Sequence, residues 1–168
     1  MMPTRFKVSI IVCSDRAHMG IYEDQSTPAI IHWCDKNKIA VIKHQLIPDD
    51  INVLQTQILN FLEEVDFVIV CGGTDIGPKD ITPQALCKIA DYEIPGIGEM
   101  IRYESLKYSV NAYLSRCGGW VKNHKIILAL SGHPKAVIEQ LEIVNPLIPN
   151  IMAALKGECK HPRHEHND

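Results

Sequence analysis

The chain has 168 residues, 46% hydrophobic and 22% charged, which is enough to bury one substantial core and most simply forms one domain. Seventeen basic and twenty acidic residues give a net charge of −3 without a long basic run, which argues against a nucleic-acid partner held by phosphate neutralisation. The six cysteines include no C-x-x-C pair, the N-terminus lacks the features of a signal peptide, and no apolar run approaches bilayer length. We therefore expect a cytoplasmic protein with reduced thiols and no membrane contact.

Hydrophobic periodicity switches repeatedly between strand and helix along the chain. It predicts strands over residues 8–13, 39–47, 67–71 and 125–130. It predicts helices over residues 28–35, 51–65, 95–108 and 134–144, with a further helix starting near Pro83. This alternation indicates a three-layer α/β/α domain with a mainly parallel sheet over residues 1–156. The polar tail, residues 157–168, fits no standard zinc motif and is expected to be disordered.

The third predicted strand runs directly into a glycine-led turn. Gly72 and Gly73 lack a Cβ, so the backbone can turn sharply there and a ligand can approach the peptide groups closely. Thr74 adds a hydroxyl group. The turn has the composition of a phosphate-binding loop, although a plain connection from strand to helix explains it equally well.

A helix start follows that turn. Thr82 before Pro83 is typical of an N-cap with proline at the first helical position, which leaves free N–H groups and the positive end of the helix dipole facing the turn. These groups favour an anion. Asp80 is compatible with an anion site where a divalent cation bridges the carboxylate to the ligand.

Polar or glycine-rich clusters follow all four predicted strands. They are Ser14, Asp15 and Arg16 after the first strand, Pro48, Asp49 and Asp50 after the second, Gly72 to Thr74 after the third, and Ser131, Gly132, His133, Pro134 and Lys135 after the fourth. In open α/β sheets, ligands bind outside the carboxyl ends of the strands. Each cluster alone is more simply explained as a helix cap, but their expected convergence on one edge favours a binding site. The usual P-loop and Rossmann fingerprints are absent.

CGGTDIGPKDITP, at 71–83, resembles the G-G-T-G-x-x-x-R-D-x-T-P signature of molybdopterin-binding proteins of the MogA and MoaB type. The resemblance covers nearly the whole chain. Its other segments are SDRAHMGIYED at 14–24, LIPDD at 46–50, IPGIGEMIR at 94–102, SLKYSVNAYLSR at 105–116 and SGHPKAV at 131–137, and they look most like the MogA branch.

This resemblance implies an enzyme that transfers AMP from Mg-ATP to molybdopterin and releases pyrophosphate. Asp49 and Asp80 match the two functionally critical carboxylates of the family, and Asp80 would hold Mg²⁺. The residues implied to bind substrate are Ser14, Asp15, Gly72, Gly73, Thr74, Asp75, Thr82 and Ser131 to Lys135. The resemblance also implies a homotrimer and a molybdate-insertion enzyme acting downstream.

Three positions depart from the family pattern. Asp75 stands where glycine is usual, Ser131 where proline is usual, and Lys79 where arginine is usual. Aspartate tolerates a left-handed backbone, so the turn can survive, but a carboxylate beside phosphates adds repulsion unless it meets a metal. Asp75 therefore supports the alternative of a non-catalytic molybdopterin-binding or scaffold protein. A Rossmann-type oxidoreductase is disfavoured by the missing fingerprint.

Two further residues are candidates for a role in the site. Cys71 has no paired histidine in the sequence, so buried packing is favoured over a nucleophile. Arg116, placed after a possible strand, could contact a phosphate or form a surface pair.

Overall fold

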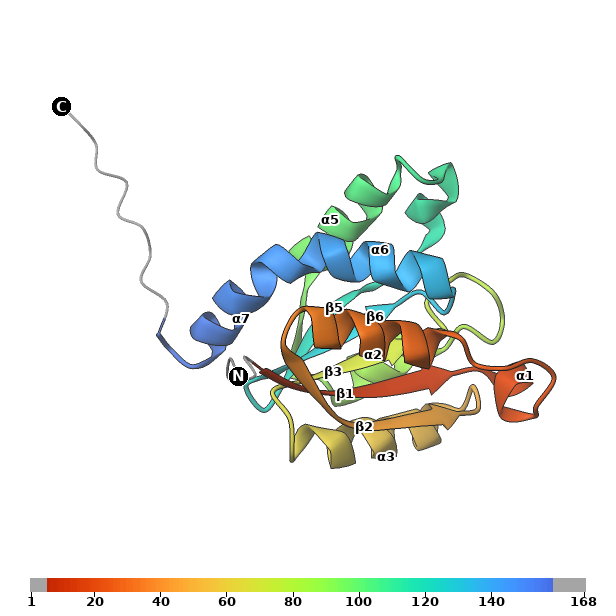
Figure 1. Ribbon diagram of the computed structural model, residues 1–168, viewed down its shortest axis with the longest axis horizontal. Helices are drawn as coiled ribbons and strands as arrows, with labels where there is room; N and C mark the ends of the chain where they lie inside the picture. The colour runs from red at the N-terminus through yellow and green to blue at the C-terminus, as the bar shows by residue number, and fades with distance from the viewer. Residues whose placement is uncertain (1–5, 159–168) are drawn as a thin grey trace.

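A six-stranded mixed sheet forms the centre of the computed structural model, which describes residues 6–158 (Figure 1). The strands are β1 (Phe6–Cys13), β2 (Ile39–Ile47), β3 (Phe67–Cys71), β4 (Tyr92–Ile94), β5 (Gly118–Lys122) and β6 (Lys125–Leu130), in the order β2-β1-β3-β6-β5-β4. The pairs β2–β1, β1–β3 and β3–β6 are parallel, whereas β5 and β4 are antiparallel to their neighbours. The mainly parallel sheet is confirmed. The tail from residue 159 lies outside the described residues.

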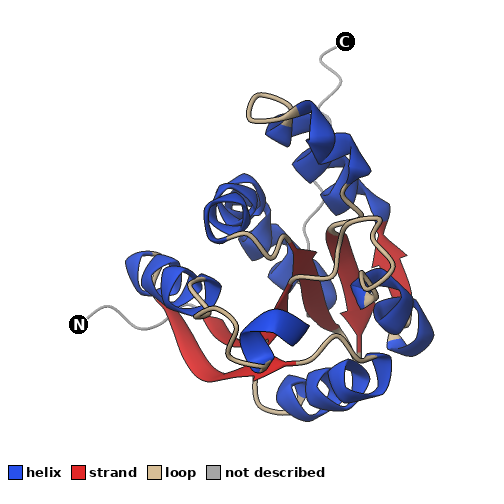
Figure 2. Ribbon diagram, turned by 90° about the vertical axis from the view of Figure 1, so that its right-hand side faces the viewer, coloured by secondary structure: helices blue, strands red, loops and turns tan. Residues whose placement is uncertain are grey.

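Helices cover both faces of the sheet, which confirms the three-layer architecture (Figures 1 and 2). One face packs against α2 (Ser26–Lys36), α5 (Pro95–Ser105), α6 (Pro134–Val144) and α7 (Ile148–Leu155). The other face packs against α3 (Ile51–Leu62) and α4 (Thr82–Ile89). The short elements are α1 (Asp15–His18) and the 3₁₀ helices η1 (Val110–Leu114) and η2 (Asn145–Leu147).

The central strands are apolar on both faces because helices cover both sides of the sheet. Successive residues of β1 and β3 alternate between the two halves of the core: Ile10 and Ile69 face the α2 side, and Ile11 and Val70 face the α3 side. All four side chains are fully buried. The continuous apolar runs in the sequence therefore mark buried parallel strands, as predicted.

Helix ends differ from the prediction where local capping or turns intervene. The helix α2 begins at Ser26 rather than Pro28 because the Asp24 carboxylate accepts hydrogen bonds from the backbone N–H groups of Ser26 and Thr27, at 2.9 and 3.1 Å. The helix α5 ends at Ser105 rather than residue 108, where the chain turns toward η1. The strands β4 and β5 were not predicted.

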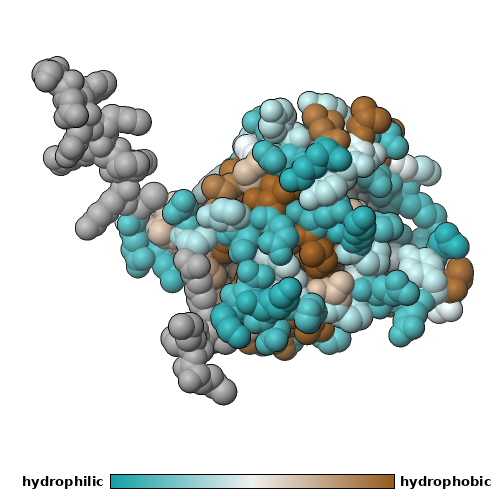
Figure 3. Space-filling model, turned by 45° about the horizontal axis from the view of Figure 1, so that its top comes forward, coloured by the Kyte–Doolittle hydropathy of each residue, from teal (hydrophilic) through white to brown (hydrophobic). Residues whose placement is uncertain are grey.

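The surface is mostly hydrophilic in Figure 3, where exposed apolar residues form small separate areas. Val110 and Leu114 of η1 are exposed apolar residues. Within residues 6–158, no helix has the length and apolar character needed to cross a membrane.

Candidate active site

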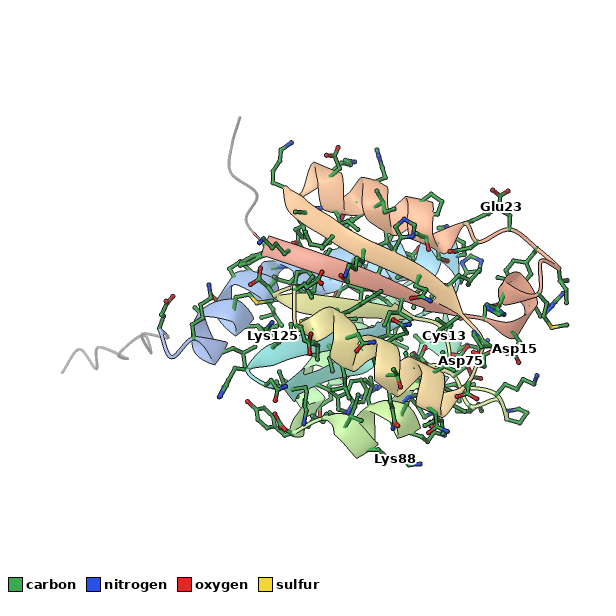
Figure 4. The ribbon with its side chains drawn as sticks, turned by 90° about the horizontal axis from the view of Figure 1, so that it is seen from below. Cys13, Asp15, Glu23, Asp75, Lys88 and Lys125 are labelled. Atoms are coloured by element: carbon green, nitrogen blue, oxygen red, sulfur yellow. The ribbon has the colours of Figure 1, made fainter. Side chains whose placement is uncertain are left out.

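The predicted clusters meet at a cavity of about 590 Å³ beside the carboxyl ends of β1, β2, β3 and β6. Eleven of the fourteen predicted site residues line it: Ser14, Asp49, Gly72, Gly73, Thr74, Asp75, Asp80, Ser131, Gly132, His133 and Pro134. Figure 4 shows Cys13, Asp15 and Asp75 together at this end of the sheet, while Lys125 lies at the opposite end. The parallel topology gathers these residues because it places the ends of the four strands side by side.

The remaining three predicted residues lie outside the cavity lining. Thr82 is fully buried beneath the glycine turn, and Lys135 is exposed on α6 with its backbone N–H donating to His133 Nδ1 at 3.3 Å. Asp15 stands beside the cavity, where its carboxylate accepts a hydrogen bond from Lys79 Nζ at 2.7 Å. Lys79 itself lines the cavity.

The turn after β3 depends on its two glycines. Gly72 and Gly73 have φ values of +103° and +68°. A Cβ on Gly72 would lie 2.4 Å from Cys13 O, and a Cβ on Gly73 would lie 2.5 Å from Thr82 Oγ1. Asp75 is not among the described residues with positive φ, so the turn does not rely on the tolerance of aspartate for a left-handed backbone; the two glycines adopt that conformation.

Thr82 is not the N-cap of α4. It is the first helical residue, and Ile81 occupies the cap position without a side-chain hydrogen bond. The Thr82 hydroxyl instead donates to Gly72 O at 2.8 Å, and the Thr82 backbone N–H donates to Gly73 O at 3.0 Å. Thr82 therefore fastens the glycine turn to the helix that follows it.

The turn after β6 packs directly against the turn after β3. A Cβ on Gly132 would lie 3.1 Å from Gly72 Cα, so the two backbones touch. Gly132 O also accepts a hydrogen bond from Ser26 Oγ at 3.0 Å, which ties the start of α2 to the same place. The Cys71 thiol donates to Ser131 O at 3.0 Å, and burial raises its pKa. Cys71 thus has the buried, packing environment that the sequence favoured.

Asp15 and Asp49 bind each other's backbone at one side of the cavity. Asp15 N–H donates to Asp49 Oδ2 at 3.0 Å, and Asp49 N–H donates to Asp15 Oδ1 at 2.8 Å. The cap of α3 is Asp50, whose carboxylate accepts from Val53 N–H at 2.9 Å. Asp49 is therefore not the helix cap, and its carboxylate is free of that structural role.

The charges on these carboxylates act on one another. Burial raises the pKa of Asp49, and the negative charges of Asp15 and Asp80 raise it further, against a lowering hydrogen bond from the Asp15 backbone. The pKa of Asp15 is lowered, chiefly by its hydrogen bond from Lys79. Burial and then the charge of Asp80 raise the pKa of Asp75, while Arg116 lowers it. Asp80 is thus the shared neighbour of Asp49 and Asp75.

The segment between α1 and α2 also lines the cavity, and the prediction of site residues missed it. Its lining residues are Tyr22, Glu23, Asp24 and Gln25. Tyr22 Oη and Ser14 Oγ form a hydrogen bond of 2.7 Å, which holds the segment against the end of β1. Figure 4 shows Glu23 on this loop, beyond the end of the strands. The SDRAHMGIYED motif includes Tyr22, Glu23 and Asp24, so the resemblance pointed to this segment. The local sequence does not show, however, that the segment lies against turns that are distant in the chain.

The chain is similar to known proteins over most of its length. Residues 9–150 match the probable molybdopterin binding domain. The chain is 34% identical to the molybdopterin adenylyltransferase of Haemophilus influenzae, covering 92% of this chain and 83% of the relative. It is also 34% identical to the molybdopterin adenylyltransferase of Helicobacter pylori, covering 89% and 88%. The crystal structure of the molybdopterin biosynthesis enzyme MoaB from Thermus thermophilus superimposes with a TM-score of 0.84 at 30% identity, covering 90% of this chain and 97% of that one.

Proposed function

Because the chain belongs to the MogA/MoaB family of molybdopterin-binding proteins in molybdenum cofactor biosynthesis, we propose that it is a molybdopterin adenylyltransferase. It would transfer AMP from Mg-ATP to molybdopterin and release pyrophosphate. The observation that carries the proposal is the meeting of Asp49 and Asp80 with two glycine turns around a single cavity.

The reaction suits a site of carboxylates and backbone donors. A phosphate oxygen of molybdopterin forms a bond to the α-phosphorus of ATP, and the bond from that phosphorus to the β-bridging oxygen breaks as pyrophosphate leaves. Such a transfer needs in-line positioning and charge neutralisation more than a protein nucleophile. In this proposal Gly72, Gly73 and Thr74 cradle a phosphate, and Ser131 to Pro134 line the neighbouring part of the pocket.

The carboxylates suit Mg²⁺ held jointly with substrate phosphates. Asp80 lies close enough to Asp49 and Asp75 to raise the pKa of both, so a cation placed between them would relieve the repulsion. Within residues 6–158, no group of three His, Cys, Asp or Glu side chains is arranged to hold a metal ion unaided. Mg²⁺ commonly binds through one or two carboxylates and completes its octahedron with phosphate oxygens and water. Bound in this way, it would neutralise charge on the reacting phosphates.

A non-catalytic molybdopterin-binding or scaffold role is the second candidate, and Asp75 favours it. Its carboxylate lines the cavity, where an uncompensated negative charge would weaken the binding of phosphates. The homotrimer and a molybdate-inserting enzyme downstream are further proposals from the family resemblance. Light scattering on the purified protein would measure the oligomeric state.

Pyrophosphate release from radiolabelled ATP, measured by chromatography, tests the function. We expect release only when both molybdopterin and Mg²⁺ are present, together with transfer of the labelled AMP to molybdopterin. Binding of molybdopterin without release would favour the scaffold role. The Asp50→Asn variant is a matched control, because asparagine is also a good N-cap and Asp50 does not line the cavity.

A further inference from the structure

One guanidinium group spans the loop that carries two of the cavity's carboxylates. Arg116 Nε donates to Asp75 O at 2.8 Å, and Nη2 donates to Asp80 O at 2.7 Å. The Arg116 backbone N–H donates to Thr74 O at 2.6 Å. The third guanidinium nitrogen, Nη1, donates to Gln84 Oε1 on α4 at 3.1 Å. A single residue therefore holds both ends of residues 74–80, the carboxylate loop.

The antiparallel strand β5 brings Arg116 to this place. Gly118, at the start of β5, pairs with Ala129 near the end of β6, so the residues that precede β5 reach the edge where β3 and β6 end. The sequence placed Arg116 after a strand, and the structure places it before one. Arg102 of α5 supports the same segment, since its Nη1 donates to Ser115 O and Cys117 O at 3.3 and 3.2 Å.

The carboxylate loop has further fastenings. Lys79 Nζ forms an ion pair of 2.7 Å with Asp15, which links the loop to the start of α1 through an exposed side chain. Asp80 N–H donates to Gly77 O at 3.1 Å and Gly77 N–H donates to Asp80 Oδ2 at 2.8 Å, so both bonds are internal to the loop. The charge of Asp80 raises the pKa of Asp75, which means that the two carboxylates repel each other within it. Arg116 opposes that repulsion and fixes the backbone from which both side chains project.

We propose that Arg116 is a positioning residue for the transfer reaction, which sets the carboxylates of Asp75 and Asp80 by holding the carboxylate loop at both ends. The inference deepens the proposed function and rests on it for its kinetic part. The role depends on geometry more than on charge, because the planar guanidinium reaches three acceptors at once in fixed directions. A lysine ammonium keeps the charge and loses that fork.

The Arg116→Lys variant separates geometry from charge, and two measurements are made on it. Hydrogen exchange of the backbone amides reports the order of the carboxylate loop, without any substrate. We expect exchange there to rise at least about tenfold, while β3 and β6 stay protected. Steady-state kinetics should show kcat falling about 10- to 100-fold, as for partners that orient ligating groups, with a smaller change in KM. Free guanidinium added to Arg116→Ala should restore part of the lost kcat.

Gln84→Ala is the matched control, because it removes the contact to α4 and leaves both contacts to loop carbonyls. It should keep loop exchange and kcat within about twofold of wild type. Wild-type kcat and loop exchange in Arg116→Lys would overturn the inference. So would a large fall in Tm with faster exchange throughout β3 and β6, which would make Arg116 a residue of global stability. If the wild-type protein transfers no AMP, the proposed function fails, while loop exchange still decides whether Arg116 orders the loop.

Discussion

At the residue scale, Asp80 has the central electrostatic position in the cavity. Its charge contributes to the raised pKa of Asp49 on one side and of Asp75 on the other. Its Oδ2 is held by Gly77 N–H, and its carbonyl is held by Arg116, so both the carboxylate and the backbone are oriented. An oriented carboxylate with two acidic neighbours is suited to a cation that arrives with the substrate.

Asp80→Asn should reduce adenylyl transfer by two or more orders of magnitude, because asparagine keeps the shape and removes the charge that would organise a metal-centred stabilisation. The amide oxygen can still accept from Gly77 N–H, so Tm should change little. Pyrophosphate release per folded molecule is the measurement, with Asp50→Asn as the control. Unchanged turnover in Asp80→Asn would show that Asp80 is not a catalytic residue.

Asp75→Gly should bind anionic substrate more tightly, because it removes a negative charge from the cavity lining. The gain should be on the order of 1 kcal/mol, a several-fold lower Kd, and it should shrink as salt rises. Asp75→Asn removes the charge without adding glycine's backbone freedom, so the pair separates the two effects. A collapse of ATP binding in both variants would show that Asp75 is itself a ligand of the substrate or metal.

At the element scale, the site is built where two strand-to-helix turns touch. The chain leaves β3 through Gly72 and Gly73 and leaves β6 through Gly132, and the backbones of these turns meet because neither carries a side chain at the contact. Thr82 then bonds the first turn to the start of α4, and Ser26 bonds the second to the start of α2. Gly72 and Gly73 are thus required by their positive φ and by packing, and Gly132 keeps the two turns in close contact, whatever the ligand.

Gly72→Ala should destabilise the fold by at least about 1 kcal/mol, since its φ is +103° and the new Cβ would lie 2.4 Å from the backbone atom Cys13 O. A loss of this size lowers Tm by roughly 2–4 °C for a chain of this length. Gly96→Ala is the control, because a Cβ there meets nothing within 4 Å. It lies in α5, so alanine should leave Tm unchanged or raise it. Equal melting temperatures for both variants would contradict this packing argument.

At the scale of the whole molecule, folding gathers carboxylates that are far apart in the sequence. The parallel strands place Asp15, Asp49, Asp75 and Asp80 at one edge, and Lys79 forms an ion pair with Asp15 there. The raised pKa values of Asp49 and Asp75 mean that their ionisation opposes folding. These two carboxylates therefore lower the stability of the fold at the place where a cation or substrate would bind, which is common at functional sites.

Asp49→Asn should raise Tm at pH 8, and the gain should shrink as pH falls toward 4. The folded-state pKa of Asp49 is raised, so the folded chain binds more protons than the unfolded chain above the ordinary carboxyl pKa of about 3.9. Wild-type stability therefore falls as pH rises through this window, and asparagine removes the loss. Its Oδ1 can still accept from Asp15 N–H. Thermal melts at several pH values measure the effect.

The Asp50→Asn variant controls for the loss of one negative charge in the same turn, and it should show no comparable gain at pH 8. A gain for Asp49→Asn that is as large at pH 4 as at pH 8 would mean that titration of this carboxyl is not its cause. A lower Tm at pH 8 would mean that its hydrogen bonds outweigh its burial.

Local patterns in the sequence determined most of the fold and the edge of the sheet where the cavity lies. The strands 39–47, 67–71 and 125–130 were predicted with the observed bounds because each ends at a clear change to proline, glycine or polar residues. Once the strands are parallel and alternate with helices, their carboxyl ends must share an edge. The convergence of Ser14, Asp49, Gly72 and Ser131 follows from that rule alone.

Contacts across long sequence separations decided the rest. The strand β5 was not predicted because Gly118 and Gly119 weaken its pattern. A Cβ on Gly119 would lie 2.5 Å from Ile97 Cδ1, so the Ile97 side chain of α5 packs into the space that the glycine leaves. Thr82 was predicted as a helix cap because it precedes Pro83. The prediction failed because the Thr82 hydroxyl bonds to Gly72, in a turn ten residues away that the local sequence does not reveal. Arg116 reaches carbonyls 36 and 41 residues earlier in the chain. Local propensity does not depend on such distant partners. They are set only when the sheet has formed and the pairing of β5 with β6 brings the residues before β5 to this edge.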